Sequence, residues 1–184
     1  MTKTAELIYD YVMPVIKLDG LRFFFISEGE LEIVKVVEYK YIGIRQNRST
    51  YNLAFGTYIL ETDGLDDHDI SNNGDHYKVL NTVLSTIPRF LDHYPEAMIV
   101  VEGSDSVTSY PEFCRQNCRK KCIAPDCKNA NRRINIYKKY VNKNFNQLSE
   151  DYIFWGVLKD NENKAIIEEY QVINNYSSVL FIKK

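Results

Sequence analysis

All four cysteines of this 184-residue chain lie in one short segment, with the spacing Cys114-x3-Cys118-x3-Cys122-x4-Cys127. Four thiolates are a common ligand set for structural zinc, although this spacing matches no standard zinc motif. If residues 114–122 are helical, the first three cysteines recur every four residues and share one helix face. A turn at residues 124–126 would then bring Cys127 back as the fourth ligand. Zinc held by all four thiolates is therefore one prediction from this segment.

Three other interpretations of the cysteines stay open. Neighbouring Lys and Arg side chains favour oxidation as well as metal binding, so a reactive redox thiol is one alternative. Disulfides would form if the protein were secreted or oxidised. The simplest alternative is a set of free cysteines in a loop insertion. An iron–sulfur cluster is a variant of the metal hypothesis.

The same region is strongly basic. Residues 114–143 hold ten Lys and Arg against Asp126 alone, whereas the rest of the chain has 13 basic and 24 acidic residues. Clustered positive charge favours binding to nucleic acid, because each cation on a phosphate releases counterions, and an acidic protein would use the same charge. The alternative is a solvated basic face without a ligand. The candidate binding residues are Arg115, Arg119, Lys120, Lys121, Arg132, Lys139 and Lys143.

A second chemically suggestive stretch is ETDGLDDHDISNNGDH, residues 61–76, which contains five Asp together with His68 and His76. It lacks the alternating order of carboxylates in a calcium-binding loop. Acid–base chemistry by Asp75 or His76 would need a nucleophile at a recognisable spacing, and none is present. We therefore expect a solvated turn here and predict no catalytic residue.

The elements that position these residues follow from hydrophobic periodicity. Residues 21–27, 31–44 and 50–61 are predicted strands with short connections, which is typical of an antiparallel meander. Residues 75–94 carry apolar side chains at helical spacing, and residues 97–103 form a short apolar run typical of a buried strand.

The last part of the chain is predicted to hold a helix at 130–145 and strands at 151–159 and 177–184. At about 100° per residue, Arg132, Lys139 and Lys143 lie on the helix side opposite the apolar arc. That arc comprises Ile134, Tyr137, Tyr140, Val141 and Phe145. The predicted fold is a single α+β domain, 1–184, with an antiparallel-rich mixed sheet, two flanking helices and the order β-β-β-α-β-α-β-β.

Three segments of the chain resemble a bacterial family of unknown function. They are NGDHYKVLNTVLSTIPRFLDHYP, IVVEGS and RRINIYKKYV, which match the pattern of an N-G-D-x-x-K-V-L-x-T-V segment, a strand ending in G-S and an R-x-R-L-Y helix. In that pattern the G-S leads almost directly into the helix, whereas here 28 residues separate Ser104 from Arg133. The resemblance therefore predicts an insertion at about 105–131, and it implies no activity.

A looser resemblance links the element order to the core of GNAT-type N-acetyltransferases. It implies a GNAT-like topology and an acetyl-CoA pyrophosphate at the start of the first helix. Such a site needs glycines and basic residues, because backbone N–H groups must approach phosphate oxygens. The segment SNNGD instead follows five carboxylates: Glu61, Asp63, Asp66, Asp67 and Asp69. An acyltransferase-like enzyme, or its inactive relative, is accordingly the alternative function.

Composition sets the expected compartment. The chain is 45% hydrophobic and 26% charged, which is ordinary for a soluble globular protein. No apolar run is long enough to span a membrane, and Glu6 and Asp10 argue against a signal peptide. We therefore predict a cytoplasmic, non-enzymatic interaction module that binds nucleic acid or an acidic protein through a basic face stapled by zinc.

Overall fold

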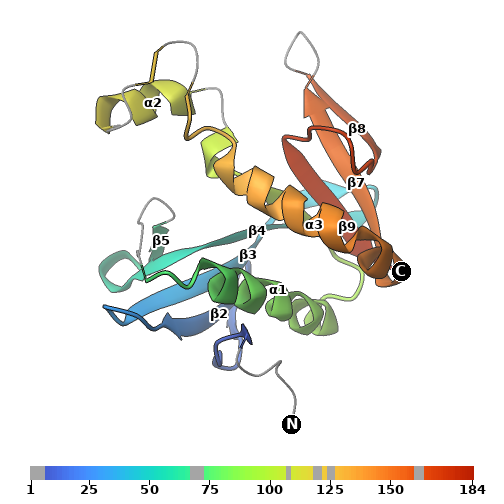
Figure 1. Ribbon diagram of the computed structural model, residues 1–184. Coiled ribbons are helices and arrows are strands. Elements are labelled where there is room, and N and C mark those ends of the chain that lie inside the picture. The colour runs from blue at the N-terminus through green and yellow to red at the C-terminus, as the bar shows by residue number, and fades with distance from the viewer. Residues whose placement is uncertain (1–6, 67–72, 107–108, 118–121, 124–126, 160–163) are drawn as a thin grey trace. The chain divides into compact units, whose positions relative to one another are not determined.

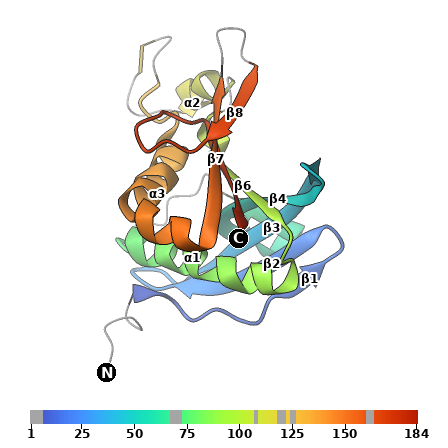
Figure 2. The same cartoon turned by 90° about the vertical axis from the view of Figure 1, so that its right-hand side faces the viewer.

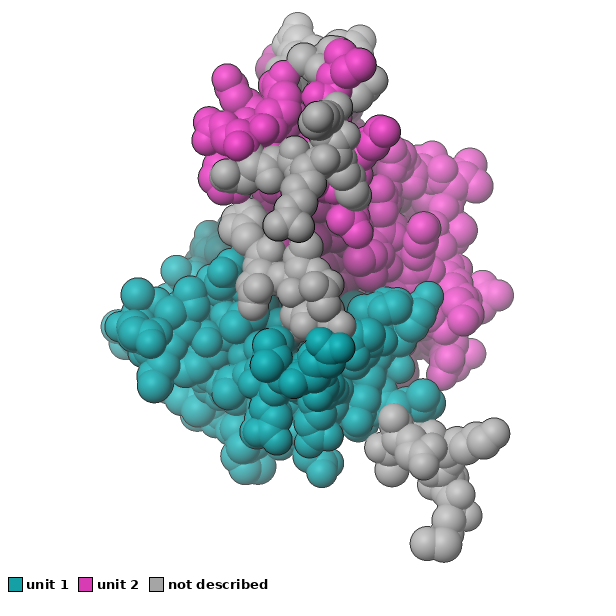
Figure 3. Space-filling view, turned by 60° about the vertical axis from the view of Figure 1, so that its left-hand side comes forward, with its two compact units in different colours: residues 1–97 teal, residues 98–184 magenta. Residues whose placement is uncertain are grey.

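The computed structural model describes residues 7–66, 73–106, 109–117, 122–123, 127–159 and 164–184. The chain divides into two compact units, unit 1 (Met1–Ala97) and unit 2 (Met98–Lys184), which Figure 3 colours separately. Each unit combines helices with antiparallel strands, so the predicted α+β class is confirmed.

Unit 1 is built on antiparallel strand pairs that join β1 to β2, β2 to β3, β3 to β4 and β4 to β5 (Figure 1). The predicted three-strand meander corresponds to β2, β3 and β4 and is confirmed, while β1 and β5 add short strands that were not predicted. The strands are β1 (Val15–Lys17), β2 (Gly20–Ser27), β3 (Ile33–Arg45), β4 (Arg48–Ile59) and β5 (Gly64–Asp66).

The register of the long hairpin is set by its turn and by one bulge. Gln46 and Asn47 both have positive φ, 49° and 59°, which is the backbone of a two-residue type I′ turn between paired Arg45 and Arg48. The bulge lies between Tyr41 and Gly43. Gly43 has φ 126°, a conformation that glycine adopts without strain.

Helix α1 (His76–His93) covers the inner face of β2 and β3, and a 3-10 turn (Leu60–Thr62) precedes β5. The buried side chains of α1 include Val79, Val83, Phe90 and Leu91, the periodic stripe that predicted a helix at 75–94. The ring of Phe90 stacks on Tyr39 with the centroids 4.0 Å apart. This aromatic contact lies in the core of unit 1.

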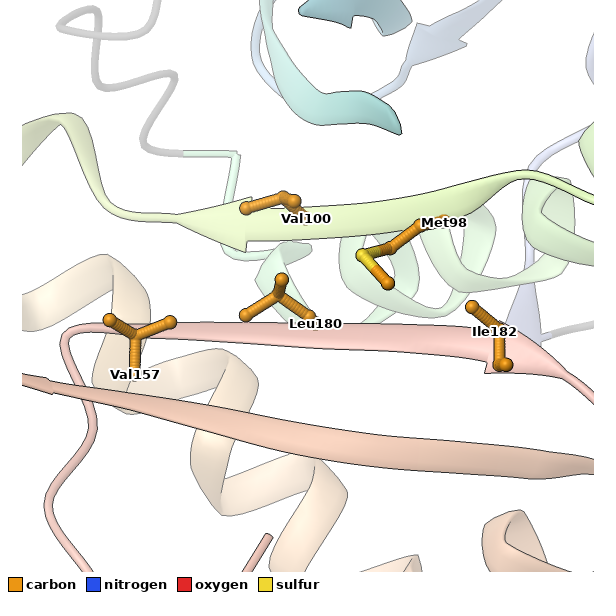
Figure 4. Packing of buried hydrophobic residues seen from close by; sticks show 5 residues of the cluster. All are labelled: Met98, Val100, Val157, Leu180 and Ile182. Atoms are coloured by element: carbon orange, nitrogen blue, oxygen red, sulfur yellow. The ribbon is translucent and has the colours of Figure 1, made fainter. Parts of the chain in front are cut away.

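Unit 2 contains β6 (Met98–Glu102), β7 (Tyr152–Lys159), β8 (Ala165–Glu169) and β9 (Ser178–Lys183), paired antiparallel in the order β6-β9-β7-β8. Its core is an aliphatic cluster, against which Trp155 packs from the side. Figure 4 shows the cluster: Met98, Val100, Val157, Leu180 and Ile182.

Two α-helices and a short 3-10 turn, η3 (Ser104–Ser106), complete unit 2. Helix α2 (Tyr110–Asn117) opens the cysteine segment, and α3 (Arg132–Asp151) packs against β6, β7 and β9 (Figure 2). The predicted helix at 130–145 is confirmed and extends six residues further, to Asp151.

The predicted element order needs correction. The described residues contain nine strands and three α-helices, because β1, β5, β8 and α2 were not predicted. β1 and β5 have three residues each, too few to show a period, and four of the five residues of β8 are exposed. Among the described residues, no helix is long and apolar enough to cross a membrane.

Candidate nucleic-acid interface

The outer side of α3 carries a basic stripe, which we define as Arg132, Ile136, Lys139 and Lys143. All four side chains are exposed, and Ile136 has half of its surface in solvent. The positions fall within an arc of about 60° and span about 16 Å along the helix axis. None of the three cations forms an ion pair with a carboxylate among the described residues.

The inner side of α3 fixes the direction of this stripe. Ile134 and Tyr137 are buried, and Phe145 contacts the rings of Phe154 and Tyr170. Burying this apolar arc turns the cations toward solvent, as the sequence predicted.

The start of α3 is held by the turn that follows β6. The buried Asp105 carboxylate accepts a hydrogen bond from the Arg133 backbone N–H at 3.0 Å, and the Asp105 carbonyl accepts one from Asn131 N–H at 3.1 Å. The Arg133 guanidinium donates to Ser104 Oγ. The two ends of the 105–131 segment therefore lie side by side, although the predicted insertion itself stays a prediction.

The Asp105 carboxylate also lies where the N-terminus of α3 would bind an anion. It already takes the place of an anion at the first turn, where helix N–H groups attract negative charge. A phosphate at this end would meet that carboxylate. The N-terminus of α3 is therefore already occupied by a carboxylate of the chain itself.

Three of the four cysteines are described, and all three are free thiols. Cys122 Sγ accepts a hydrogen bond from Lys128 N–H at 3.4 Å, and Cys114 Sγ accepts one from Asn129 Nδ2 at 3.3 Å. Cys118 lies outside the described residues, so the four-thiolate zinc site stays a prediction. Within the part of the chain that the structure describes, no group of three or more His, Cys, Asp or Glu is arranged to hold a metal.

The remaining predicted binding residues fall before α3. Arg115 is exposed on α2, where its Nε donates to the Pro111 carbonyl at 3.2 Å. Arg119, Lys120 and Lys121 lie outside the described residues. Among the predicted binding residues that the structure describes, Arg132, Lys139 and Lys143 lie together on one side of α3.

The N-G-D segment at the start of α1 has a structural role. Asp75 Oδ2 accepts hydrogen bonds from Tyr9 OH at 2.7 Å and Ser27 Oγ at 2.6 Å. Burial opposes the charge of Asp75, but the hydrogen bonds from Ser27 and Tyr9 outweigh it and lower the pKa of the carboxyl. Asn73 Nδ2 donates to the Leu31 carbonyl at 2.9 Å. Asn73 and Asp75 thus pin α1 to β2 and to the β2–β3 turn.

Sequence reasoning missed one buried cation on α3. Lys138 is 7% exposed, its Nζ donates to Asn175 Oδ1, and burial lowers its pKa. Helical periodicity could have found it, because position 138 lies about 20° from Phe145, at the edge of the inner arc.

A family model matches residues 8–110, more than half of the chain. Its description is a family of unknown function, DUF6934. The chain belongs to this family. The predicted resemblance to an uncharacterised family is thereby confirmed. No curated protein and no solved structure matches the chain, and the GNAT-like resemblance gains no support.

The DUF6934 match covers the described elements of unit 1 together with β6 and η3, and it ends at Tyr110, the first residue of α2. Asp75 and its hydrogen-bond donors Tyr9 and Ser27 lie inside the matched range. The cysteines and the basic stripe lie outside it. The family therefore accounts for a scaffold, and the candidate interface is carried by other residues.

Proposed function

We propose that this protein is a non-enzymatic module that binds nucleic acid through the basic stripe on α3. The observation that carries the proposal is three exposed cations, Arg132, Lys139 and Lys143, on one side of a well-anchored helix. No described carboxylate neutralises them, so binding a phosphate would not require an existing ion pair to break.

The dimensions of the stripe suit a phosphate backbone. Each strand of a duplex carries one phosphate per about 3.4 Å of helix axis, so a stripe about 16 Å long faces several phosphates. Ile136 is the apolar member of the stripe and offers no hydrogen bond to a base edge. We therefore expect binding that depends on charge and shows little sequence preference.

Salt dependence tests this proposal. With three phosphate contacts, raising the salt from 50 to 200 mM should weaken binding roughly 40-fold, following a slope of about −0.9 per contact. Fluorescence anisotropy with a labelled 20-base-pair duplex, and with a single strand of the same length, measures this directly. Absent binding at 50 mM salt, or binding that ignores salt, would overturn the proposal.

A matched pair of variants separates local contacts from net charge. R132A/K139A/K143A should weaken binding by at least about tenfold and flatten the salt slope by about 2.7. R45A/K159A/K183A removes the same charge from exposed positions outside the stripe and should retain most of the affinity. Equal losses in both variants would reject the stripe as the binding site.

We further propose that zinc staples the segment through Cys114, Cys118, Cys122 and Cys127. Support comes from the two sulfurs that accept N–H hydrogen bonds from consecutive residues, Lys128 and Asn129, immediately after Cys127. Elemental analysis of the purified protein should find about one equivalent of zinc. Less than half an equivalent would reject the site.

The acyltransferase alternative finds no specific support among the described residues. Its pyrophosphate would approach the start of α1, where Asp75 keeps a carboxylate hydrogen-bonded to Tyr9 and Ser27. Millimolar acetyl-CoA is accordingly expected to leave the melting temperature unchanged.

A further inference from the structure

One surface feature of unit 1 that the proposed function does not use is an apolar groove beside β2, with a volume of about 570 Å³. Its lining includes the apolar side chains of Val12, Phe24, Ile26 and Val34 and the carboxylates of Asp10 and Glu28. These six residues define what is called the groove below.

Strand alternation explains why apolar side chains face outward here. Phe23 and Phe25 are buried under α1, so Phe24 and Ile26 must point to the other face of β2. Val34 lies directly opposite Ile26 in the antiparallel register. Val12, Ile26 and Val34 are 58%, 47% and 43% exposed. A contiguous apolar strip of this kind, with acidic neighbours, is typical of an interaction surface.

The charge around the groove is negative. Asp10 and Glu28 are exposed, as are Glu30 and Glu32 on the adjoining β2–β3 turn, and none forms an ion pair among the described residues. The cation at the groove is Lys78, whose ammonium lies 3.9 Å from the centroid of the Tyr9 ring. An occupant should therefore combine an apolar side chain with flanking positive charges.

The chain itself carries such a segment. In the basic stripe, Ile136 lies between Arg132 and Lys139, with Lys143 one turn further on. The two units also have opposite net charge, because unit 1 holds 9 basic and 15 acidic residues and unit 2 holds 14 and 10.

We propose that the groove of one molecule binds the basic stripe of a second copy of this chain. Ile136 would enter the apolar strip while the cations meet Asp10 and Glu28. One helix stripe in one groove buries less than the roughly 1,200 Å² of a standard stable interface, so the association is weak and concentration-dependent. A single contact leaves a free groove on one molecule and a free stripe on the other, which further copies can use.

This inference does not rest on nucleic-acid binding, but both use the stripe. A short duplex that occupies the stripe should dissociate the assembly. High salt should do the same, because charge complementarity supplies much of the attraction.

Sedimentation from 10 to 500 µM protein tests the inference. At 20 mM salt the weight-average mass should rise above the 21.5 kDa of one chain, and at 500 mM salt it should return to that value. Wild-type protein that stays at 21.5 kDa throughout would overturn the inference and leave the groove to a different partner.

Charge reversal gives the sharper experiment. D10K/E28K places positive charge at the groove, and K139E/K143E places negative charge on the stripe, so each variant alone should be monomeric. Mixing the two should restore association, because each now complements the other. E61K/D92K, which reverses two exposed carboxylates outside the groove, should associate like the wild type. Failure of the mixture to associate would overturn the proposed contact.

The two proposals fail separately. D10K/E28K keeps the stripe intact and should still bind duplex DNA, so loss of self-association with retained DNA binding separates the surfaces. Self-association without any DNA binding would reject the proposed function and leave the second-copy contact standing.

Discussion

Charged side chains around the β5 turn and the start of α1 in unit 1 serve a different purpose from those of the basic stripe in unit 2. In unit 1, Arg22 bridges Glu38 and Asp63, and Lys17 also reaches Asp63, so cations join neighbouring strands and the β5 turn. The carboxylate of Asp75 has the same kind of role at the start of α1. In unit 2, the cations of the basic stripe point to solvent without a described carboxylate partner.

This contrast separates charges that hold the fold from charges that are available to a ligand. A carboxylate such as that of Asp75 makes its hydrogen bonds inside the protein. Removing it should lower the free energy of unfolding and leave the affinity for a ligand unchanged. An exposed unpaired cation contributes little to stability, so removing it should change binding alone. Asp105 lies between these cases, because its hydrogen bond with Arg133 N–H holds the start of the helix that carries the stripe.

Asp105→Ala should have the largest effect on stability. It removes a buried carboxylate from the first turn of α3, so the free energy of unfolding should fall by about 3 kcal/mol in urea denaturation. Binding of duplex DNA should weaken as well, because the start of the stripe loses its anchor. Asp105→Asn is the matched control, since its amide oxygen can still accept from Arg133 N–H, and it should cost less than about 1 kcal/mol. Equal losses in both variants would show that charge, rather than the helix cap, is what Asp105 supplies.

Asp75→Ala should destabilise the protein by about 2 kcal/mol without changing DNA affinity, because it removes the acceptor for Tyr9 and Ser27 in unit 1. The folded-state pKa of Asp75 is lowered, so its contribution is present above the unfolded pKa of about 3.9 and is lost as the pH falls through the folded value. Urea denaturation between pH 5 and pH 2.5 should therefore show a steeper decline for the wild type than for Asp75→Asn. Asp92→Asn, at an exposed helical position, should keep the wild-type slope. A weakened DNA affinity in Asp75→Ala would break the division between the two units.

The long elements could be predicted from the sequence, because each repeats its pattern over many residues. α1 and α3 run for 18 and 20 residues, and their apolar arcs identified the helices and placed Arg132, Lys139 and Lys143 on the outside. β1 and β5, with three residues each, carry too little pattern to be found.

The hydrogen bonds of the Asp75 and Asp105 carboxylates could not be predicted from the sequence, for a different physical reason. Tyr9 is hydrogen-bonded to Asp75, 66 positions further along the sequence, and Asp105 to Arg133, 28 positions further along. Both hydrogen bonds therefore form only in the folded chain. Local periodicity does not encode them. The sequence therefore predicts a solvated turn for the acidic stretch at 61–76, although Asp75 in this stretch accepts structural hydrogen bonds from Tyr9 and Ser27.

Lys138 gives the smallest expected effect, and it tests whether every cation of α3 serves binding. Burial lowers the pKa of Lys138, so the unfolded chain binds more protons between the folded pKa and the unfolded value of about 10.4, and stability should rise with pH in that window. Lys138→Met keeps the length of the side chain and removes the buried charge, so it should be neutral or stabilising by about 1 kcal/mol at pH 7. Its advantage should shrink as the pH rises toward the unfolded value of about 10.4. This range avoids the titration of Tyr170, whose pKa burial raises to about 12. DNA affinity should stay at the wild-type value, because Lys138 faces the core; a tenfold loss would instead make the buried side of α3 part of the interface.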